Sequence, residues 1–317
     1  MNQASDKYND TYVTFVGHVE LYKYRYLYFT VMFIVYILIL CSNSIVVYLV
    51  YINENLHEPM YIFIAALLLN CLLFSTNIYP KLLIDFLSDK QITSFLLCHF
   101  QAFLYYSLSG SELLLLAAMA YDRYVSICKP LQYSTIMRKT TVRNLLVLAW
   151  ILPACQLVPS IFIMTTLNVC NLTLKAIFCN NAVSKLYCMS SNTLYVIYGV
   201  VIILSTILFP MLFILFTYLK ILIISHRSSK IVRKKAAQTC TPHLLVLISF
   251  SCLWTYDIVI ARLEIDLHKT ARLILSLQVI LYHPLFNPII YGLKMQKISK
   301  HIKRLFCKLS VSLKTNV

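Results

Sequence analysis

An acidic and a basic residue, Asp122 and Arg123, stand side by side at the end of a long apolar run. The run directly before them reads LLLLAAMA and contains nothing that would solvate a charge. Because a charge next to hydrocarbon is costly, it is usually paired, functional or both. The simpler alternative is a membrane-edge anchor, whose basic side chain reaches the lipid headgroups. The pair by itself does not decide between these two interpretations.

Residue patterns typical of catalysis or metal binding do not occur in this sequence. We find no HExxH motif, no paired acids, no Ser–His arrangement and no spacing of Cys and His that suggests zinc. Glu112 is the one acid that falls deep in an apolar run. We therefore expect neither an enzyme nor a resident metal or cofactor.

The composition indicates a membrane protein. Of the 317 residues, 60% are hydrophobic and only 13% are charged, and the mean hydropathy is +0.74. A soluble domain would carry about 25% charged residues. The formal net charge of +16 could suggest nucleic acid, but the basic residues lie in short segments between apolar runs. We therefore expect no nucleic-acid partner.

Seven apolar stretches are long enough for membrane-crossing helices, because a crossing takes about 20 residues. The sixth is the weakest, since Cys240, Thr241, Pro242 and His243 dilute its first half. The stretches cover residues 27–51, 60–80, 102–121, 145–164, 194–219, 236–256 and 273–293.

These stretches predict an all-α membrane protein, a seven-helix transmembrane bundle followed by a short amphipathic helix. We divide the chain into an extracellular N-terminus (1–26), the transmembrane domain (27–293) and a cytoplasmic amphipathic helix with its tail (294–317). The first apolar run follows a polar stretch, so we expect a retained anchor and no cleaved signal.

The distribution of Lys and Arg predicts the orientation of the bundle in the membrane. Of the 28 basic residues, 18 fall on the face that follows the third, fifth and seventh stretches. That face should be cytoplasmic, which places the N-terminus outside. The short loop after the first stretch does not fit this distribution, because it should be cytoplasmic but carries the acids Glu54 and Glu58.

Glycosylation sequons and cysteines agree with this orientation. The sequons at Asn9 and Asn171 both fall on the predicted outer face. Four of the 11 cysteines, Cys98, Cys170, Cys179 and Cys188, also fall outside, where disulfides persist. Four cysteines allow three pairings, and the sequence pattern alone leaves these open.

Four motifs in order resemble those of the odorant receptors, a family of rhodopsin-like G-protein-coupled receptors. They are LHEPMY at 56–61, MAYDRYVSICKPLQY at 119–133, KAAQTCTPHL at 235–244 and PLFNPIIYGLK at 284–294. The resemblance runs from Asn43 to about Leu305 and implies a receptor for a small odorant at the plasma membrane of sensory-neuron cilia. Its partner would be a stimulatory heterotrimeric G protein that raises cyclic AMP.

The resemblance assigns roles to residues at the predicted cytoplasmic end. It implies that Arg123 is held in the resting state and contacts the G protein after activation. Asn43 and Trp150 match anchors of the first and fourth spans. The residues matched to coupling and activation are Asp122, Arg123, Tyr124, Tyr218, Asn287, Pro288 and Tyr291. For the disulfides, the resemblance implies the pairs Cys98–Cys179 and Cys170–Cys188. The alternative for Tyr218 and Tyr291 is an interfacial aromatic anchor.

Two positions depart from the family pattern. Cys71 stands where most rhodopsin-like receptors have an aspartate that helps to hold sodium, so sodium regulation is in doubt. The sequence leaves open whether Glu112 is protonated, bonded to a hydroxyl such as Ser109, or an ion ligand. Ser251 replaces a tyrosine that is frequent in the sixth span, and Trp254 one turn on could take over part of its packing.

The ligand should lie in the outer half of the bundle, where helical spacing gathers side chains from the third, fifth and sixth spans. An apolar wall with a few hydroxyls suits a small, neutral or weakly polar molecule. Ordinary helix packing is the alternative for about half of these positions. The expected binding residues are Tyr105, Tyr106, Ser109, Ile202, Thr206, Ser251, Trp254, Thr255 and Ile258, with Leu277 and Ile280 from the seventh span. Asp257 and Arg262 at the mouth are better explained as solvated loop ends than as a site for a charged odorant.

Residues after the seventh span predict a helix that lies on the membrane surface. Met295, Ile298, Ile302, Leu305 and Phe306 share one face, and lysines cover the other. Its partner would be anionic lipid, with Cys307 a candidate for palmitoylation.

Two other functions remain as alternatives at this stage. One is a different rhodopsin-like receptor, for a peptide or a lipid. The other is a transporter or channel, which would usually show internal repeats or paired intramembrane charges.

Overall fold

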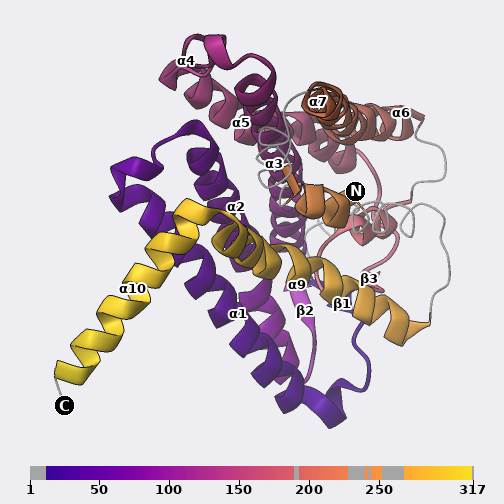
Figure 1. Cartoon of the computed structure of the whole chain (residues 1–317). Helices are drawn as coiled ribbons and strands as arrows, with labels where there is room; N and C mark the ends of the chain where they lie inside the picture. The colour runs from indigo at the N-terminus through magenta and orange to yellow at the C-terminus, as the bar shows by residue number, and fades with distance from the viewer. Residues whose placement is uncertain (1–11, 189–192, 228–239, 242–243, 252–267, 316–317) are drawn as a thin grey trace.

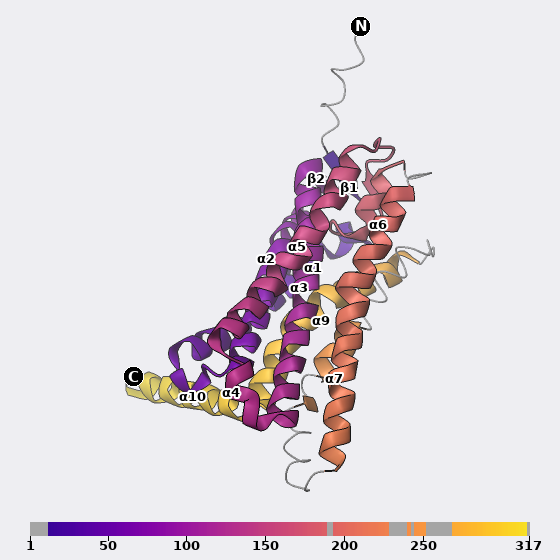
Figure 2. The same ribbon diagram turned by 90° about the horizontal axis from the view of Figure 1, so that it is seen from above.

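The protein is a bundle of long helices that lie roughly side by side (Figures 1 and 2). The computed structural model describes residues 12–188, 193–227, 240–241, 244–251 and 268–315. The longest helices are α1 (Leu21–Ile52), α2 (Pro59–Leu87), α3 (Phe95–Cys128), α5 (Lys139–Thr165) and α9 (Lys269–Lys294). Shorter ones are α4 (Tyr133–Ile136), α6 (Thr193–Ile203), α7 (Phe209–His226) and α10 (Gln296–Thr315).

Six helical segments of the described residues are long and apolar enough to cross a membrane. They correspond to six of the seven predicted spans. The predicted sixth span, 236–256, falls partly outside the described residues, and 244–251 within it are helical. The chain is therefore a helical membrane protein, as the apolar pattern predicts, and six of the seven predicted spans are present in the described residues.

Several helices extend beyond the predicted apolar limits. α1 begins at Leu21 rather than residue 27, and α3 begins at Phe95 rather than residue 102. Ser94 caps α3, because its hydroxyl oxygen accepts a hydrogen bond from the backbone N–H of Leu97 at 3.3 Å. Hydrophobicity marks only the part of a helix that lies in hydrocarbon, so helical turns that enter the polar region escape it.

The fifth span is interrupted by one π-helical turn, Leu204–Leu208, between α6 and α7. Pro210 follows this turn and has no N–H to donate to the carbonyl of Thr206. π-Turns widen a helix locally and are frequent at functional sites. The fifth span therefore has a wide turn that contains Thr206, directly before α7, which carries Pro210 in its first turn.

A small sheet covers one end of the bundle, which the sequence did not lead us to expect. It has the order β2-β1-β3, from β1 (Tyr12–Phe15), β2 (Ile92–Ser94) and β3 (Thr173–Leu174). β1 runs antiparallel to β2 and parallel to β3. Its alternate residues Val13 and Phe15 are buried against the core. We call this end the sheet end. The opposite end carries α10 and the end of α3 (Figure 2), and we call it the Arg123 end because Arg123 lies in the last turns of α3.

α10 leaves α9 at a sharp bend and contacts both α9 and α1 (Figure 1). Met295, directly before α10, and Ile298 of α10 are buried, and Ile302 and Leu305 of α10 are half-buried. Lys297 forms an ion pair with Glu58 at 2.6 Å, next to the start of α2. The two-faced pattern predicted for this helix is therefore present in its described side chains.

Buried asparagines join the helices across the bundle. The Asn43 amide donates to the carbonyl oxygens of Ile39 and Pro284, both at 2.8 Å, which joins α1 to α9. The Asn70 amide donates to the Leu108 carbonyl oxygen at 2.9 Å, and its own oxygen accepts from the Trp150 ring N–H at 3.3 Å. Asn70 thereby connects α2, α3 and α5.

We expect Asn70→Ala to lower the free energy of unfolding by about 1–2 kcal/mol, because the Trp150 N–H loses its acceptor in an apolar core. Asn53→Ala is the matched control. Among the described residues, the Asn53 amide bonds the Leu49 carbonyl of its own helix end, so its loss should cost under about 0.5 kcal/mol. Thermal unfolding of the purified chain in detergent measures both, and equal losses would contradict the cross-helix role.

Candidate functional site

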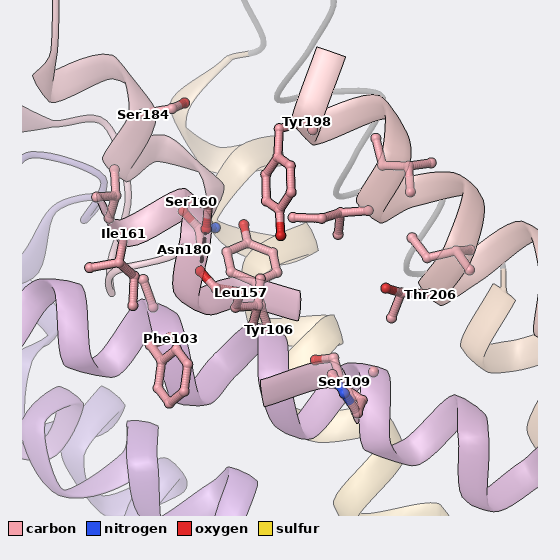
Figure 3. A pocket seen from close by; sticks show the side chains of 18 of the residues that line it. Phe103, Tyr106, Ser109, Leu157, Ser160, Ile161, Asn180, Ser184, Tyr198 and Thr206 are labelled. Carbon is pink, nitrogen blue, oxygen red and sulfur yellow. Dashed lines mark hydrogen bonds between the residues drawn. The ribbon is translucent and has the colours of Figure 1, made fainter. Parts of the chain in front are cut away.

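A cavity of ≈170 Å³ lies between α3, α5 and the fifth span, near the sheet end (Figure 3). The loop before α6 closes it with Asn180, Val183 and Ser184. Most of its wall is apolar, and the wall contains hydroxyls but no Asp, Glu, Lys or Arg among the described residues. The cavity therefore suits a small uncharged molecule.

Four of the predicted binding residues line this cavity: Tyr106, Ser109, Ile202 and Thr206. Figure 3 shows Ser109 and Tyr106 on α3 and Thr206 on the fifth span. The neighbour of Ser109, Gly110, also lies against Thr206, because a Cβ at Gly110 would be 2.9 Å from the Thr206 methyl carbon. Ser109 and Thr206 thus belong to the same part of the wall.

Tyr105, another predicted binding residue, does not line this cavity. Adjacent residues on a helix point about 100° apart, and on α3 it is Tyr106 that points to the cavity while Tyr105 points away from it. Tyr105 is 1% exposed and packs against Phe74 and Phe178, with ring centroids 5.4 Å apart in each case. It is part of the core between α2 and the loop.

Ser251 and the two residues from the seventh span are also absent from the wall. The Ser251 hydroxyl donates to the Leu247 carbonyl oxygen at 2.8 Å, within its own helix. Ile280 is fully buried, and Leu277 packs beside it in the hydrophobic core. The other expected residues, Trp254, Thr255 and Ile258, lie outside the described part of the chain, as do Asp257 and Arg262.

Sequence reasoning missed the α5 wall of the cavity, which Pro153, Leu157 and Ser160 help to form. The available signal was Gln156, a lone amide in an otherwise apolar span. The Gln156 side chain accepts from the Thr206 hydroxyl at 2.8 Å, and its backbone carbonyl accepts from the Tyr198 hydroxyl at 2.6 Å. Gln156 thus holds the fifth span against α5.

Two disulfides hold the loop over the cavity. Cys98 of α3 is joined to Cys179, and Cys170 to Cys188, the pairs that the family resemblance implies. The Gln101 side chain adds a bond, since its oxygen accepts from the backbone N–H of Cys179 at 2.9 Å. In the same loop the sequon residue Asn171 is exposed, whereas Asn9 lies outside the described residues. The loop is therefore anchored to α3 directly above the cavity.

At the Arg123 end, Asp122 is buried and binds two partners. The Arg123 guanidinium forms an ion pair with one carboxylate oxygen, and the Tyr133 hydroxyl donates to the other at 2.8 Å. Burial and then the charge of Asp122 raise the pKa of Tyr133, so this hydroxyl keeps its proton and donates. The arrangement holds Arg123 against its own helix.

The other predicted switch residues surround this end. Tyr218 and Tyr291 are buried in the same hydrophobic cluster, against which Tyr124 packs. Pro288 is buried in α9. Because the tyrosine rings belong to the core, the alternative of an interfacial anchor does not describe them.

Glu112 lies between the two ends and is bound by side chains of α9. Asn287 donates to its carboxylate at 3.1 Å, and the His283 ring nitrogen Nδ1 lies 3.5 Å from the same oxygen. Asn287 also approaches the Cys71 sulfur at 3.3 Å. The Ser109 hydroxyl donates to the Tyr105 carbonyl, so it is not the partner that the sequence suggested for Glu112.

Comparison with known proteins gives one consistent result. The family model described as "Olfactory receptor" matches residues 32–309. The chain is 32% identical to human "Olfactory receptor 2T1", over 95% of this chain and 82% of the relative. It is 33% identical to human "Olfactory receptor 2A12", over 86% of this chain and 88% of the relative. The structure matches squid rhodopsin with a TM-score of 0.76 at 20% identity, covering 95% and 92% of the two chains.

Gly110 permits the close contact between α3, α5 and the fifth span. A Cβ there would lie 2.8 Å from the Pro153 Cβ and 2.9 Å from the Thr206 methyl carbon. We expect Gly110→Ala to lower the free energy of unfolding by about 1–3 kcal/mol relative to Gly292→Ala. At Gly292 the new Cβ meets only the flexible end of Ile302, at 3.2 Å.

Both substitutions replace Gly by Ala within a helix and gain the same helix propensity. The difference between their free energies of unfolding therefore measures the packing around residue 110. Thermal unfolding of the two purified variants measures it. A Gly110→Ala variant as stable as Gly292→Ala would show that the three helices separate without cost.

Proposed function

Because this chain belongs to the olfactory receptor family, we propose that it binds a small odorant in the cavity beside Tyr106 and Thr206 and activates a stimulatory heterotrimeric G protein. The activated G protein would raise cyclic AMP. Family membership makes the chain a G-protein-coupled receptor. This excludes the alternative of a transporter or channel and agrees with the expectation that the chain is not an enzyme.

The cavity is the observation that carries the proposal. Its ≈170 Å³ is smaller than the roughly 300–1,000 Å³ of pockets for drug-sized ligands. An apolar cavity of about 150 Å³ is known to hold benzene, so this one suits a molecule with one small ring or a short chain. Volatile odorants have this size.

One rigid element connects the cavity to the coupling end. α3 carries both Ser109 and Arg123, which are about 21 Å apart along the helix axis at 1.5 Å per residue. We propose that ligand binding shifts α3 relative to α5 and the fifth span and releases Arg123 from Asp122. A ligand can do this only if it binds the released state more tightly than the resting state.

We also propose that the sheet end faces the outside of the cell and the Arg123 end the cytoplasm. The disulfides and the exposed sequon residue Asn171 belong to the sheet end. Disulfides persist in the oxidising exterior, and a sequon is typical of an outer segment. The plasma membrane of sensory cilia would then be the location.

A screen of small odorants in cells that express the full chain, with cyclic AMP as the readout, tests this function. The sharpest variant is Leu157→Trp, which puts an indole into the cavity from α5. We expect the half-maximal dose of any active odorant to rise by about tenfold or more, since overpacking costs 1–3 kcal/mol and 1.4 kcal/mol is tenfold.

Leu152→Trp is the matched control, because Leu152 lies on the same helix and is 41% exposed. Its response should equal that of the unchanged chain at equal surface expression. A Leu157→Trp variant with an unchanged dose response would place the ligand elsewhere.

The second test concerns coupling. We expect Arg123→Ala to abolish the cyclic AMP response while odorant binding to the purified receptor changes by less than about twofold, a change worth under 0.5 kcal/mol. The reason is position, since Arg123 lies far from the cavity and is held only by Asp122 in its described side-chain contacts.

Arg143→Ala is the control, an exposed arginine at the start of α5 on the same end. It should signal normally. A normal response from Arg123→Ala at the cell surface would refute the coupling role.

A further inference from the structure

For four hydroxyls on the cavity wall, the hydrogen-bond partners show whether the hydroxyl donates or accepts. These are Ser109, Ser160, Tyr198 and Thr206 (Figure 3). A hydroxyl has one hydrogen to donate and two lone pairs that accept. What it can offer a ligand therefore depends on where its hydrogen already goes.

Three of these hydroxyls donate to backbone carbonyls. The Ser109 oxygen lies 2.7 Å from the Tyr105 carbonyl oxygen, and the Ser160 oxygen lies 2.6 Å from that of Leu157. The Tyr198 oxygen lies 2.6 Å from the Gln156 carbonyl oxygen. Because a carbonyl has no hydrogen, the hydroxyl must donate in each case.

The bonds of Ser205 and Gln156 decide whether the Thr206 hydroxyl donates or accepts. The Ser205 hydroxyl donates to the carbonyl oxygens of Val201 at 2.8 Å and Ile202 at 3.2 Å, so toward the Gln156 side chain it can only accept. The Gln156 group 3.3 Å from Ser205 must then be the amide NH₂, which directs the amide oxygen at Thr206. The Thr206 hydroxyl therefore donates to Gln156, at 2.8 Å.

All four hydroxyls consequently present lone pairs, not hydrogens, to the cavity. His99 has no ring nitrogen to spare, since Nδ1 bonds the Phe95 carbonyl at 2.8 Å and Nε2 the Tyr187 hydroxyl at 2.6 Å. The Asn180 oxygen accepts from the Ala182 N–H at 3.1 Å, which leaves its amide hydrogens as donors beneath the loop. On the helical walls, the wall groups with known direction are acceptors.

We propose that the ligand of this receptor is a neutral hydrogen-bond donor, an alcohol or phenol rather than an aldehyde, ketone, ester or carboxylate. This inference rests on the proposed function. The donated hydrogen goes to the lone pairs of Ser109 and Thr206, which share one part of the wall. At Ser109 and Thr206, a ligand that only accepts must turn the hydroxyl toward itself and leave the Tyr105 carbonyl or the Gln156 oxygen without that bond. Sites built on buried polar groups discriminate strongly against analogues that leave them unpaired.

The test uses pairs of primary alcohols and aldehydes with the same carbon skeleton, which differ by a donor but not in heavy atoms. Binding is measured as the shift in melting temperature of the purified full chain in lipid nanodiscs, and signalling as cyclic AMP in cells. Among pairs that bind, we expect the alcohol to be about two- to tenfold more potent than its aldehyde, the effect of one net hydrogen bond.

Thr206→Val should bring the ratio of alcohol to aldehyde potency toward one, and Thr206→Ser should keep it. Thr76→Val is the matched control: the Thr76 hydroxyl also donates to an oxygen of the protein at 2.8 Å, here the Leu72 carbonyl, but Thr76 is exposed on α2 and outside the cavity. That variant should keep the ratio.

The outcomes separate this inference from the proposed function. Aldehydes as potent as alcohols, with Leu157→Trp still blocking both, would overturn the donor inference and leave the odorant site standing. An unchanged ratio in Thr206→Val would also overturn it. Alcohols that stabilise the purified receptor without raising cyclic AMP would support the inference and refute the coupling. If no compound of either class stabilises the receptor or signals, both proposals fail.

Discussion

The arrangement of this receptor depends on one constraint: a polar group inside an apolar bundle needs a partner within the protein. Asn43 and Asn70 meet that need by bonding backbone carbonyls of other helices, and Asn287 does so through Glu112. Each of these hydrogen bonds can form only when the two helices stand at one position relative to each other along their axes. Apolar packing alone tolerates sliding more readily, so these few amides set the register of α1, α2, α3, α5 and α9.

The same constraint shapes the cavity. Gln156 uses both its side-chain oxygen and its backbone carbonyl to hold hydroxyls of the fifth span. The π-turn places Thr206 within reach of that amide, and Gly110 keeps α3 close enough to complete the wall. The hydroxyls that we propose to orient a ligand are thus also ones that join the fifth span to α5. In the proposed mechanism, a ligand that changes their bonds acts on the packing of α3, the helix that carries the Asp122–Arg123 pair.

Much of the fold could be predicted because apolar length is a property of the chain itself. The run LLLLAAMA and its counterparts predicted the spans, and the two faces of α10 were visible in the spacing of Met295, Ile298 and Ile302. The three-stranded sheet could not be predicted. Its strands have two to four residues, and their partners lie about 80 residues or more apart along the chain, so no local pattern reports their pairing.

The sequence by itself determined the class of protein, its apolar spans and the Asp122–Arg123 pair at the end of α3, since hydrophobicity and adjacent charges are local. The tertiary structure decided which side chains meet. It turned Tyr105 into the core and Tyr106 into the cavity, brought in the α5 wall that we had not predicted, and gave Glu112 the partners His283 and Asn287. Helical spacing tells which residues share a face, but only the rotation and depth of each packed helix decide what that face meets.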